Sequence, residues 1–270
     1  MRWRIGFVIS MMLLFCMAAS AGDWKIQINR SGSIDEYVLS GIDSLTLSDG
    51  VTSRYVLDLN GANTSVTVPH ESGLNFDGPF TLEAWAMARD YQYPGHQQSP
   101  FPVNSIIDKR DDSGFGRGYG LDLDSGYPRV CVATGQSENV AAISAVQIEL
   151  YQYHHITGSY DGDSLRIFLD GICTGTQYIP ETYVIGTGNF VMGSRYSHDM
   201  YWWDGQFAGV RVSDICRYVT DFTPPSILTS DANTVAFWPL DHRAGDIAVD
   251  ESDNGHHGII ANGTWVEWSR

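Results

Sequence analysis

Short runs of alternating apolar and polar residues, separated by turn residues, constrain the fold of this chain most. One run covers residues 55–59 and ends at Asn60-Gly61, a dipeptide typical of hairpin turns. Asp161-Gly162 and Asp170-Gly171 mark two more turns. No window has the apolar spacing of a three-turn amphipathic helix. Further runs lie at residues 64–68, 80–85, 119–123, 129–132, 155–160, 164–169, 189–192, 207–212, 235–238 and 258–260.

A period of two buries one side of each strand, as two packed antiparallel sheets require. The composition agrees, because hydrophobic residues make up 43% of the 270 residues and supply a substantial core. Charged residues make up only 18%, which argues against global disorder. We therefore predict an all-β protein built around one antiparallel β-sandwich.

The first 21 residues have the pattern of a secretory signal peptide. Arg2 and Arg4 precede an uncharged apolar run at residues 5–18, and residues 19–21 (ASA) satisfy the small-x-small cleavage rule. The run is shorter than the ~20 apolar residues of a spanning helix, which is the alternative. We expect a secreted protein, extracellular or periplasmic, with no membrane insertion after cleavage of residues 1–21.

Residues 22–50 predict a small N-terminal β-hairpin segment. Alternation at residues 24–29 and again at 37–39 flanks a turn cluster at 30–33, and Asp49-Gly50 marks the boundary with a main domain at residues 53–268. Isolated hairpins are marginally stable, so we expect this one to pack on the main domain or to pair with a neighbour.

The charge and the cysteines limit the partners and the crosslinks. The formal net charge is −16, a surface that repels nucleic acid and anionic lipid. Cys131, Cys173 and Cys216 remain after signal cleavage, so at most one disulfide forms and its pairing stays open. The other interpretation is buried free cysteines. No spacing typical of a zinc site is present.

Several motifs in order resemble the LamG-like jelly rolls of the concanavalin A-like lectin/glucanase superfamily. The resemblance covers roughly residues 53–266, with Tyr153 in place of a usual tryptophan and Asp253 in place of a usual glycine. It implies that Trp203 is a core aromatic, and we expect Trp85 and Phe168 to fill the sandwich core as well. The motifs are residues 80–85 (FTLEAW), 106–109 (IIDK), 153–157 (YHHIT), 165–171 (LRIFLDG), 192–194 (MGS), 203–207 (WDGQF) and 250–258 (DESDNGHHG).

The resemblance also implies a calcium ion on the rim of the sandwich. Calcium needs six to eight oxygen ligands, which clustered Asp and Asn side chains near glycine turns supply. The alternative is a loop whose side chains bond their own backbone. The candidate metal ligands are Asp241, Asp250, Asp253 and Asn254, with Asp246 nearby.

Aromatic residues in two loops are candidates for a sugar platform. Aromatic faces stack on sugar rings, and neighbouring polar groups bond the hydroxyls. The alternative is that these rings cover the edge of the sandwich. The candidates are Tyr91, Tyr93 and His96 in the proline-rich segment 91–104, and Tyr196, His198, Tyr201 and Trp202 in a later loop.

No catalytic signature is present. The E-x-D-x-x-E strand of related glucanases is missing, as are serine-elbow and phosphate-loop motifs. Asp122 and Asp124 share a strand face, as a glycosidase pair would, but we expect solvated outward residues. His154 and His155 belong to the family pattern, which favours core or hydrogen-bonding roles.

These observations favour a secreted, non-catalytic, lectin-like carbohydrate-binding module, with Ca2+ as its expected cofactor. An extracellular protein-interaction or adhesion module is the alternative, and a glycan-cleaving enzyme is the third. The expected partner is a glycan or an extracellular protein, not nucleic acid.

Overall fold

The computed structural model divides the chain into two compact units, Met1–Thr52 and Ser53–Arg270. It describes residues 6–9, 12–17, 23–30, 33–40, 54–91, 103–111, 117–134, 140–179, 183–195 and 200–268. The first unit is an antiparallel sheet in the order β1-β2-β3-β4. Its strands are β1 (Gly6–Ile9), β2 (Met12–Met17), β3 (Asp23–Arg30) and β4 (Ser33–Ser40).

Strands β3 and β4 of this unit pair with each other. Asp23 pairs with Ser40 and Arg30 pairs with Ser33, and residues 31–32 between the strands lie outside the described residues. Cleavage of residues 1–21 stays a prediction, as do the domain bounds. No helix among the described residues has the length and apolar character to cross a membrane.

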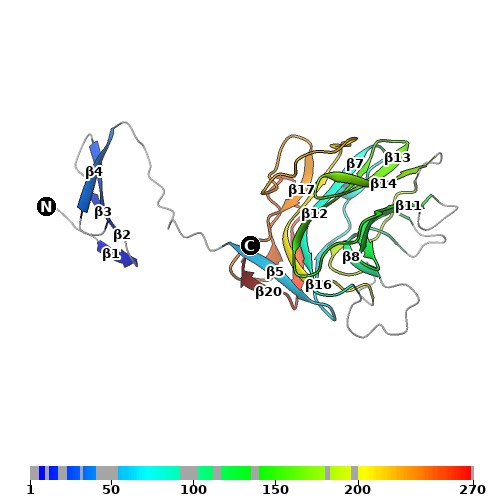
Figure 1. The fold of residues 1–270 in the computed structure, drawn as a ribbon, viewed down its shortest axis with the longest axis horizontal. Coiled ribbons are helices and arrows are strands. Elements are labelled where there is room, and N and C mark those ends of the chain that lie inside the picture. The colour runs from blue at the N-terminus through cyan, green and yellow to red at the C-terminus, as the bar shows by residue number, and fades with distance from the viewer. Residues whose placement is uncertain are drawn as a thin grey trace. The chain divides into compact units, whose positions relative to one another are not determined.

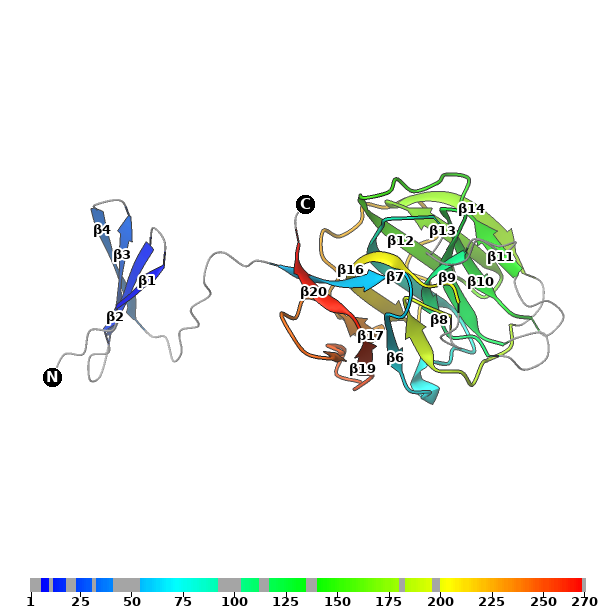
Figure 2. The same ribbon diagram turned by 90° about the horizontal axis from the view of Figure 1, so that it is seen from below.

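The second unit is a sandwich of two antiparallel sheets, here called sheet I and sheet II (Figures 1 and 2). Sheet I runs in the order β11 (Val140–Ile143), β10 (Tyr127–Val132), β9 (Tyr119–Asp124), β8 (Val103–Asp108), β15 (Phe190–Met192), β6 (Ser65–Val68), β19 (Gly258–Ala261) and β18 (Ile247–Ala248). Sheet II runs in the order β14 (Ile172–Tyr178), β13 (Ser164–Leu169), β12 (Tyr153–Tyr160), β7 (Phe80–Ala88), β16 (Asp204–Ser213), β5 (Tyr55–Asn60) and β20 (Thr264–Glu267), and β17 (Thr234–Trp238) pairs with β16.

The predicted all-β sandwich of the jelly-roll kind is therefore confirmed. Every run that the alternation identified in the main domain forms a strand, and the single short helix of the described residues is the 3-10 turn Ser72–Leu74. The apolar side of each strand packs between the sheets. In β7, for example, Phe80, Leu82 and Ala84 are fully buried in the core.

One turn prediction is wrong. Asn60-Gly61 does not close a hairpin, because β5 belongs to sheet II whereas β6 belongs to sheet I. The Asn60 side chain instead organises an arch between the sheets: its Oδ1 accepts hydrogen bonds from the Ala62 N–H at 3.0 Å and the Thr64 hydroxyl at 2.8 Å. Asp170-Gly171 does close the β13–β14 hairpin, with φ of 50° and 82°.

The large aromatics divide between two locations. Trp203 is fully buried in the core, as predicted. The prediction for Trp85 and Phe168 is wrong, because both lie on the opposite face of sheet II under residues 214–229, here called the 214–229 segment. Trp85 Nε1 donates to the Pro225 carbonyl at 3.0 Å, and the Phe168 ring lies 5.5 Å from that of Phe222. Alternation gives the parity of a strand but does not identify the face that meets the other sheet.

Of the three cysteines, none forms a disulfide in the structure. Cys131 is buried, which agrees with the free-thiol interpretation, and Cys173 and Cys216 are half-buried.

A buried lysine closes the end of β8. Lys109 Nζ donates to the Gly188 carbonyl at 2.7 Å and lies 3.1 Å from His70 Nδ1. Burial lowers its pKa from 10.5 to about 8, and the nearby Asp111 carboxylate only partly opposes this. The unfolded chain therefore keeps the proton to a higher pH than the folded chain does.

We predict that the free energy of unfolding rises between pH 8 and pH 10 by about 2 kcal/mol relative to a Lys109→Met variant. The unfolded lysine loses its proton only near pH 10.5, so raising the pH removes a proton-binding advantage of the unfolded state. Urea unfolding at both pH values measures the difference. Equal pH dependence in the two proteins would contradict the lowered pKa.

Candidate functional site

The face of sheet II that points away from the core carries polar and aromatic side chains, and we call it the outer face. The strand register places Thr264 opposite Asp58, Asp58 opposite Gln206, Gln206 opposite Met87, and Met87 opposite Tyr153. Because cross-strand partners project to the same side, these five residues form one line across the sheet. We call this line the outer row.

The 214–229 segment covers one end of the outer face and buries a charged cluster there. The fully buried Glu83 accepts hydrogen bonds from Arg211 Nε at 2.7 Å and from the Tyr218 hydroxyl at 3.1 Å. Arg211 also donates to the Thr229 carbonyl at 2.9 Å. Burial raises the pKa of Glu83, and the Arg211 guanidinium opposes that rise. The pair fixes the cover to the sheet rather than offering an accessible acid.

Both histidines have packing or hydrogen-bonding roles, as predicted. His154 Nδ1 lies 2.8 Å from an Asp170 carboxylate oxygen, and its Nε2 accepts the Glu149 N–H at 3.1 Å. His155 is fully buried, and its ring centroid lies 5.1 Å from that of Trp85. Burial, reinforced by the Arg211 charge, lowers the pKa of His155 to about 4.

The other end of the outer face is open, and a hydrogen-bonded network orders it. Arg89 Nε donates to Asp204 Oδ1 at 2.7 Å, and Arg89 Nη1 donates to Asp58 Oδ1 at 2.6 Å. Gln206 Nε2 donates to the same Asp58 oxygen at 3.0 Å, and the Tyr153 hydroxyl donates to Gln206 Oε1 at 2.5 Å. The acidic side chains are about one-fifth exposed, so water and a ligand can reach them.

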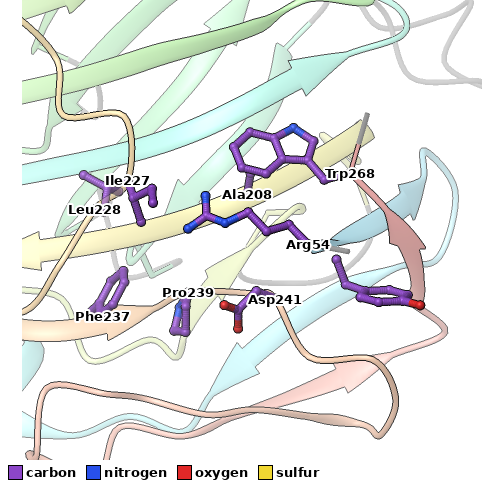
Figure 3. Close-up of a pocket in the computed structure, with 9 residues that line it drawn as sticks. Arg54, Ala208, Ile227, Leu228, Phe237, Pro239, Asp241 and Trp268 are labelled. Atoms are coloured by element: carbon purple, nitrogen blue, oxygen red, sulfur yellow. The ribbon is translucent and has the colours of Figure 1, made fainter. Parts of the chain in front are cut away.

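A small pocket with a cavity volume of about 20 Å³ lies beside the outer row (Figure 3). The Arg54 guanidinium carbon lies 5.2 Å from the Trp268 ring, and Figure 3 shows this side chain extending beneath that ring. The Trp268 ring meets Tyr153 edge to face at 5.5 Å, which joins the pocket to the outer row. The lining residues are Arg54, Tyr55, Ala208, Ile227, Leu228, Phe237, Pro239, Asp241 and Trp268.

The two ends of the sandwich build this pocket together. The Trp268 N–H donates to the Arg54 carbonyl at 2.6 Å, just beyond the β5–β20 pairing. Figure 1 shows the C-terminus beside the start of β5. The pocket wall on the far side comes from Ile227 and Leu228, where the 214–229 segment ends.

Among the predicted metal ligands, Asp250 uses its carboxylate to organise a loop. Oδ1 accepts the Phe237 and Ser252 N–H groups, each at 2.9 Å, and Oδ2 accepts the His256 N–H at 2.9 Å and the Ser252 hydroxyl at 2.8 Å. Asn254 Nδ2 donates to the Val235 carbonyl at 2.9 Å. The Asp250 and Asn254 side chains thus bond mainly to backbone groups, which is the arrangement expected if the loop is stabilised by its own side chains rather than by a calcium ion.

The remaining metal candidates are more exposed. Asp253 is exposed in the same loop, whereas Asp241 lines the pocket. No three His, Cys, Asp or Glu side chains of the described residues form a group that could hold a metal ion. The calcium site stays a prediction.

The predicted sugar-platform residues are only partly described: Tyr93, His96, Tyr196 and His198 lie outside the described residues. Tyr91 packs against the core, and its hydroxyl donates to the Ile148 carbonyl at 2.8 Å. Tyr201 and Trp202 are half-buried, and the Arg195 guanidinium carbon lies 5.8 Å from the Tyr201 ring. Their role in ligand binding stays a prediction.

The expectation that Asp122 is solvated is wrong. Its side chain is fully buried, and Arg129 contacts it through two bonds of 2.6 and 2.9 Å. Arg110 Nη2 lies 3.6 Å from Asp122 Oδ2, and Arg129 Nη1 lies 3.7 Å from Asp124 Oδ2. The two carboxylates do share a face, but guanidinium groups neutralise them.

The two face-to-face antiparallel sheets, with one polar and aromatic outer face, define a lectin-like β-sandwich. The family model of the concanavalin A-like lectin/glucanases superfamily matches residues 60–221, which is more than half of the chain. The chain therefore belongs to this superfamily, as its motifs indicate. No curated protein matches the chain.

Among solved structures, the chain is similar in fold to a candidate carbohydrate-binding protein from Bacteroides ovatus. The TM-score is 0.61 at 13% identity, over 92% of this chain and 69% of that one. A SAP-like pentraxin from Limulus polyphemus matches at 15% identity and a TM-score of 0.43, over 62% and 78% of the chains. Mouse laminin α1 domains LG4-5 match at 8% identity and a TM-score of 0.47, over 84% and 82%. The TM-scores of the last two matches are too low to support an argument.

We predict that acid destabilises the protein through His155. Its folded pKa of about 4 lies below the ordinary 6.5, so the unfolded state alone gains the proton as the pH falls from 6.5 to 4. The wild type should lose up to about 3 kcal/mol over this range relative to His155→Phe. Denaturant unfolding at pH 7 and pH 4.5 checks this, and parallel curves for both proteins would refute it.

Proposed function

We propose that the sandwich is a non-catalytic carbohydrate-binding domain whose glycan site is the open half of the outer face. The observation that carries the proposal is the contact of Trp268 with Tyr153, which places aromatic rings beside the ordered hydrogen-bonding groups of Gln206 and Asp58. Aromatic rings stack on the apolar faces of sugars, while such polar groups bond hydroxyls directly or through water.

The network of the outer row supports binding by preorganisation. Arg89 holds Asp58 and Asp204, and Gln206 is held between Asp58 and Tyr153. A ligand therefore meets groups whose side-chain entropy is already lost, which lowers the cost of association. The fold of the Bacteroides ovatus protein is consistent with this proposal but does not establish it.

We propose a non-catalytic domain because the carboxylates at the open end of this face form ion pairs with Arg89. A glycosidase needs a second, protonated carboxyl group with a raised pKa across the scissile bond. Among the described residues of the face, the carboxyl group with a raised pKa is that of Glu83, and it lies under the 214–229 segment.

A second candidate function is extracellular protein interaction through the β11–β14 edge. The edge strands of the two sheets meet here, because the N–H of Ala145, just after β11, donates to the Thr174 carbonyl of β14 at 2.9 Å. Ile143 and Ile172 on these strands are about half exposed, and Tyr178 is 62% exposed. Exposed apolar side chains on an uncharged edge strand are typical of interaction surfaces.

We predict that Trp268→Ala weakens glycan binding at least about tenfold, because it removes the stacking surface. A glycan array followed by titration calorimetry on the best glycan measures the loss. Tyr178→Ala is the matched control, since it removes an exposed aromatic ring from β14 at the opposite edge of sheet II. Equal affinity of the wild type and Trp268→Ala would locate the site elsewhere.

We also propose that the protein is secreted and that calcium binds at the 250–254 loop. Asp250→Ala should lower the melting temperature even in EDTA, because four hydrogen bonds are lost. In EDTA, Asp253→Ala should lower the melting temperature less than Asp250→Ala does, because Asp253 is exposed and only its φ of 69° disfavours alanine. If calcium binds here, it raises the wild-type melting temperature, and Asp253→Ala removes that rise. Melting temperatures that calcium leaves unchanged would reject the calcium proposal.

A further inference from the structure

The edge strands of the described sandwich differ in length and charge. Sheet I ends in β18 with two residues and β11 with four, and sheet II ends in β20 with four residues and β14 with seven. Short strands and charged side chains protect sheet edges, because an unprotected edge adds a strand from another chain. β20 is short and carries Glu267, whereas β14 (ICTGTQY) is long for an edge and uncharged.

The hydrogen bonds between β13 and β14 show which backbone groups of β14 point outward. The Ile179 N–H donates to the Asp163 carbonyl at 2.7 Å, so these two residues form a hydrogen-bonded pair. Tyr178 and Thr176 lie one and three residues before Ile179 in the same register. Because hydrogen-bonded pairs alternate along antiparallel strands, the N–H and C=O groups of Thr176 and Tyr178 point away from β13. The Gln177 side-chain amide donates to the Tyr178 carbonyl at 2.9 Å, a bond that a partner strand can replace.

The edge of sheet I meets β14 near Thr174 and Gly175. The N–H of Ala145, just after β11, occupies the Thr174 carbonyl. A Cβ atom on Gly175, which pairs with a core residue of β13, would clash with the carbonyl oxygen of Ile143. β11 therefore packs against the inner face of β14 at this point. The outward groups further along β14 stay available, and residues 176–178 are exposed.

Charge favours a second copy of the chain as the partner of this edge. The chain has 32 acidic residues against 16 lysines and arginines, so two copies repel each other where charged surfaces meet. Residues 140–148 and 171–179, which include β11 and β14, contain no charged residue, although charged residues make up 18% of the chain. Ile172 and Tyr178 expose 54% and 62% of their surface there. Two copies thus meet at β14 without facing like charges and with apolar surface to bury.

We propose that β14 pairs with β14 of a second copy in an antiparallel, two-fold symmetric dimer that extends sheet II across both chains. Because Thr176 and Tyr178 carry the available groups, the two-fold axis places Thr176 of one copy opposite Tyr178 of the other. Each of these two pairs exchanges two backbone hydrogen bonds, and Gln177 lies opposite its own counterpart. The dimer is independent of the proposed glycan site, which lies toward the opposite edge of sheet II.

Sedimentation velocity of the full chain tests the dimer. Between about 1 and about 500 µM it should show a monomer–dimer equilibrium, with a dissociation constant of about 10 to 100 µM because the contact is small. Thr176→Pro removes an outward N–H, which an edge strand tolerates, and should abolish the dimer. Gln177→Lys places two ammonium groups opposite each other and should weaken the dimer about fivefold. Ile259→Lys, at an exposed position of the inner strand β19, is the matched control and should leave the dimer unchanged.

A cysteine cross-link tests the register. Non-hydrogen-bonded pairs bring opposite Cα atoms to about 4.5 Å, within the range of a disulfide. Gln177→Cys should therefore form a disulfide-linked dimer with oxidised glutathione, which takes up the two electrons and two protons of the thiols. Thr176→Cys, whose counterpart lies diagonally across the axis, should form it at least about tenfold more slowly. Peptide mapping separates this bond from any that involves Cys173 or Cys216.

Melting temperatures establish that each variant is folded, and Trp268→Ala should dimerise like the wild type. A chain that stays monomeric up to about 500 µM would overturn the second copy as the occupant and leave the edge to a different protein. A dimer that both Thr176→Pro and Gln177→Lys leave intact would overturn the pairing of β14. Faster cross-linking of Thr176→Cys than of Gln177→Cys would overturn the register.

Discussion

The position of the 214–229 segment on sheet II is the constraint on which the candidate site depends. The segment is fixed by the Glu83–Arg211 pair, by the Tyr218 hydroxyl on Glu83, and by Pro225 on the Trp85 indole. A fully buried carboxylate is costly unless charge and hydrogen bonds compensate it, so removing one partner would leave an uncompensated charge. The cluster therefore holds the cover at one end of the face, and the pocket begins where the cover ends at Ile227 and Leu228.

The strands could be predicted from sequence because alternation is a local property. Two outcomes could not be predicted this way. Asn60-Gly61 has the sequence of a hairpin turn, yet it bridges the sheets, since the Asn60 side chain bonds Ala62 and Thr64 and so turns the chain away from its own sheet. Trp85 alternates with the core residues of its strand and so projects to the outer face, although a large aromatic residue is more typical of the core. The 214–229 segment buries its ring there, and sequence alternation does not predict that segment's position.

The candidate site could not be predicted for a different reason. Its residues come from β5, β7, β12 and β16 and from the segment after β20, and the register between strands distant in sequence brings them together. The only local signals were single polar residues in apolar runs, such as Asp58 in residues 55–59. The sequence instead indicates two aromatic loops as the sugar platform. One of them includes Tyr91, whose ring packs against the core.

The distribution of charge gives the strongest physical link between fold and site. In sheet I, Arg129 neutralises Asp122, and Arg110 neutralises Asp108; on the covered end of sheet II, Arg211 neutralises Glu83. These pairs are buried, where an unpaired charge would be costly, so the fold itself requires them. Arg54 and Arg243 lie at the solvent boundary, where stability demands no partner. Charge pairing in this sandwich therefore follows burial: the guanidinium groups that the fold encloses have carboxylate partners, whereas those that reach solvent can do without one.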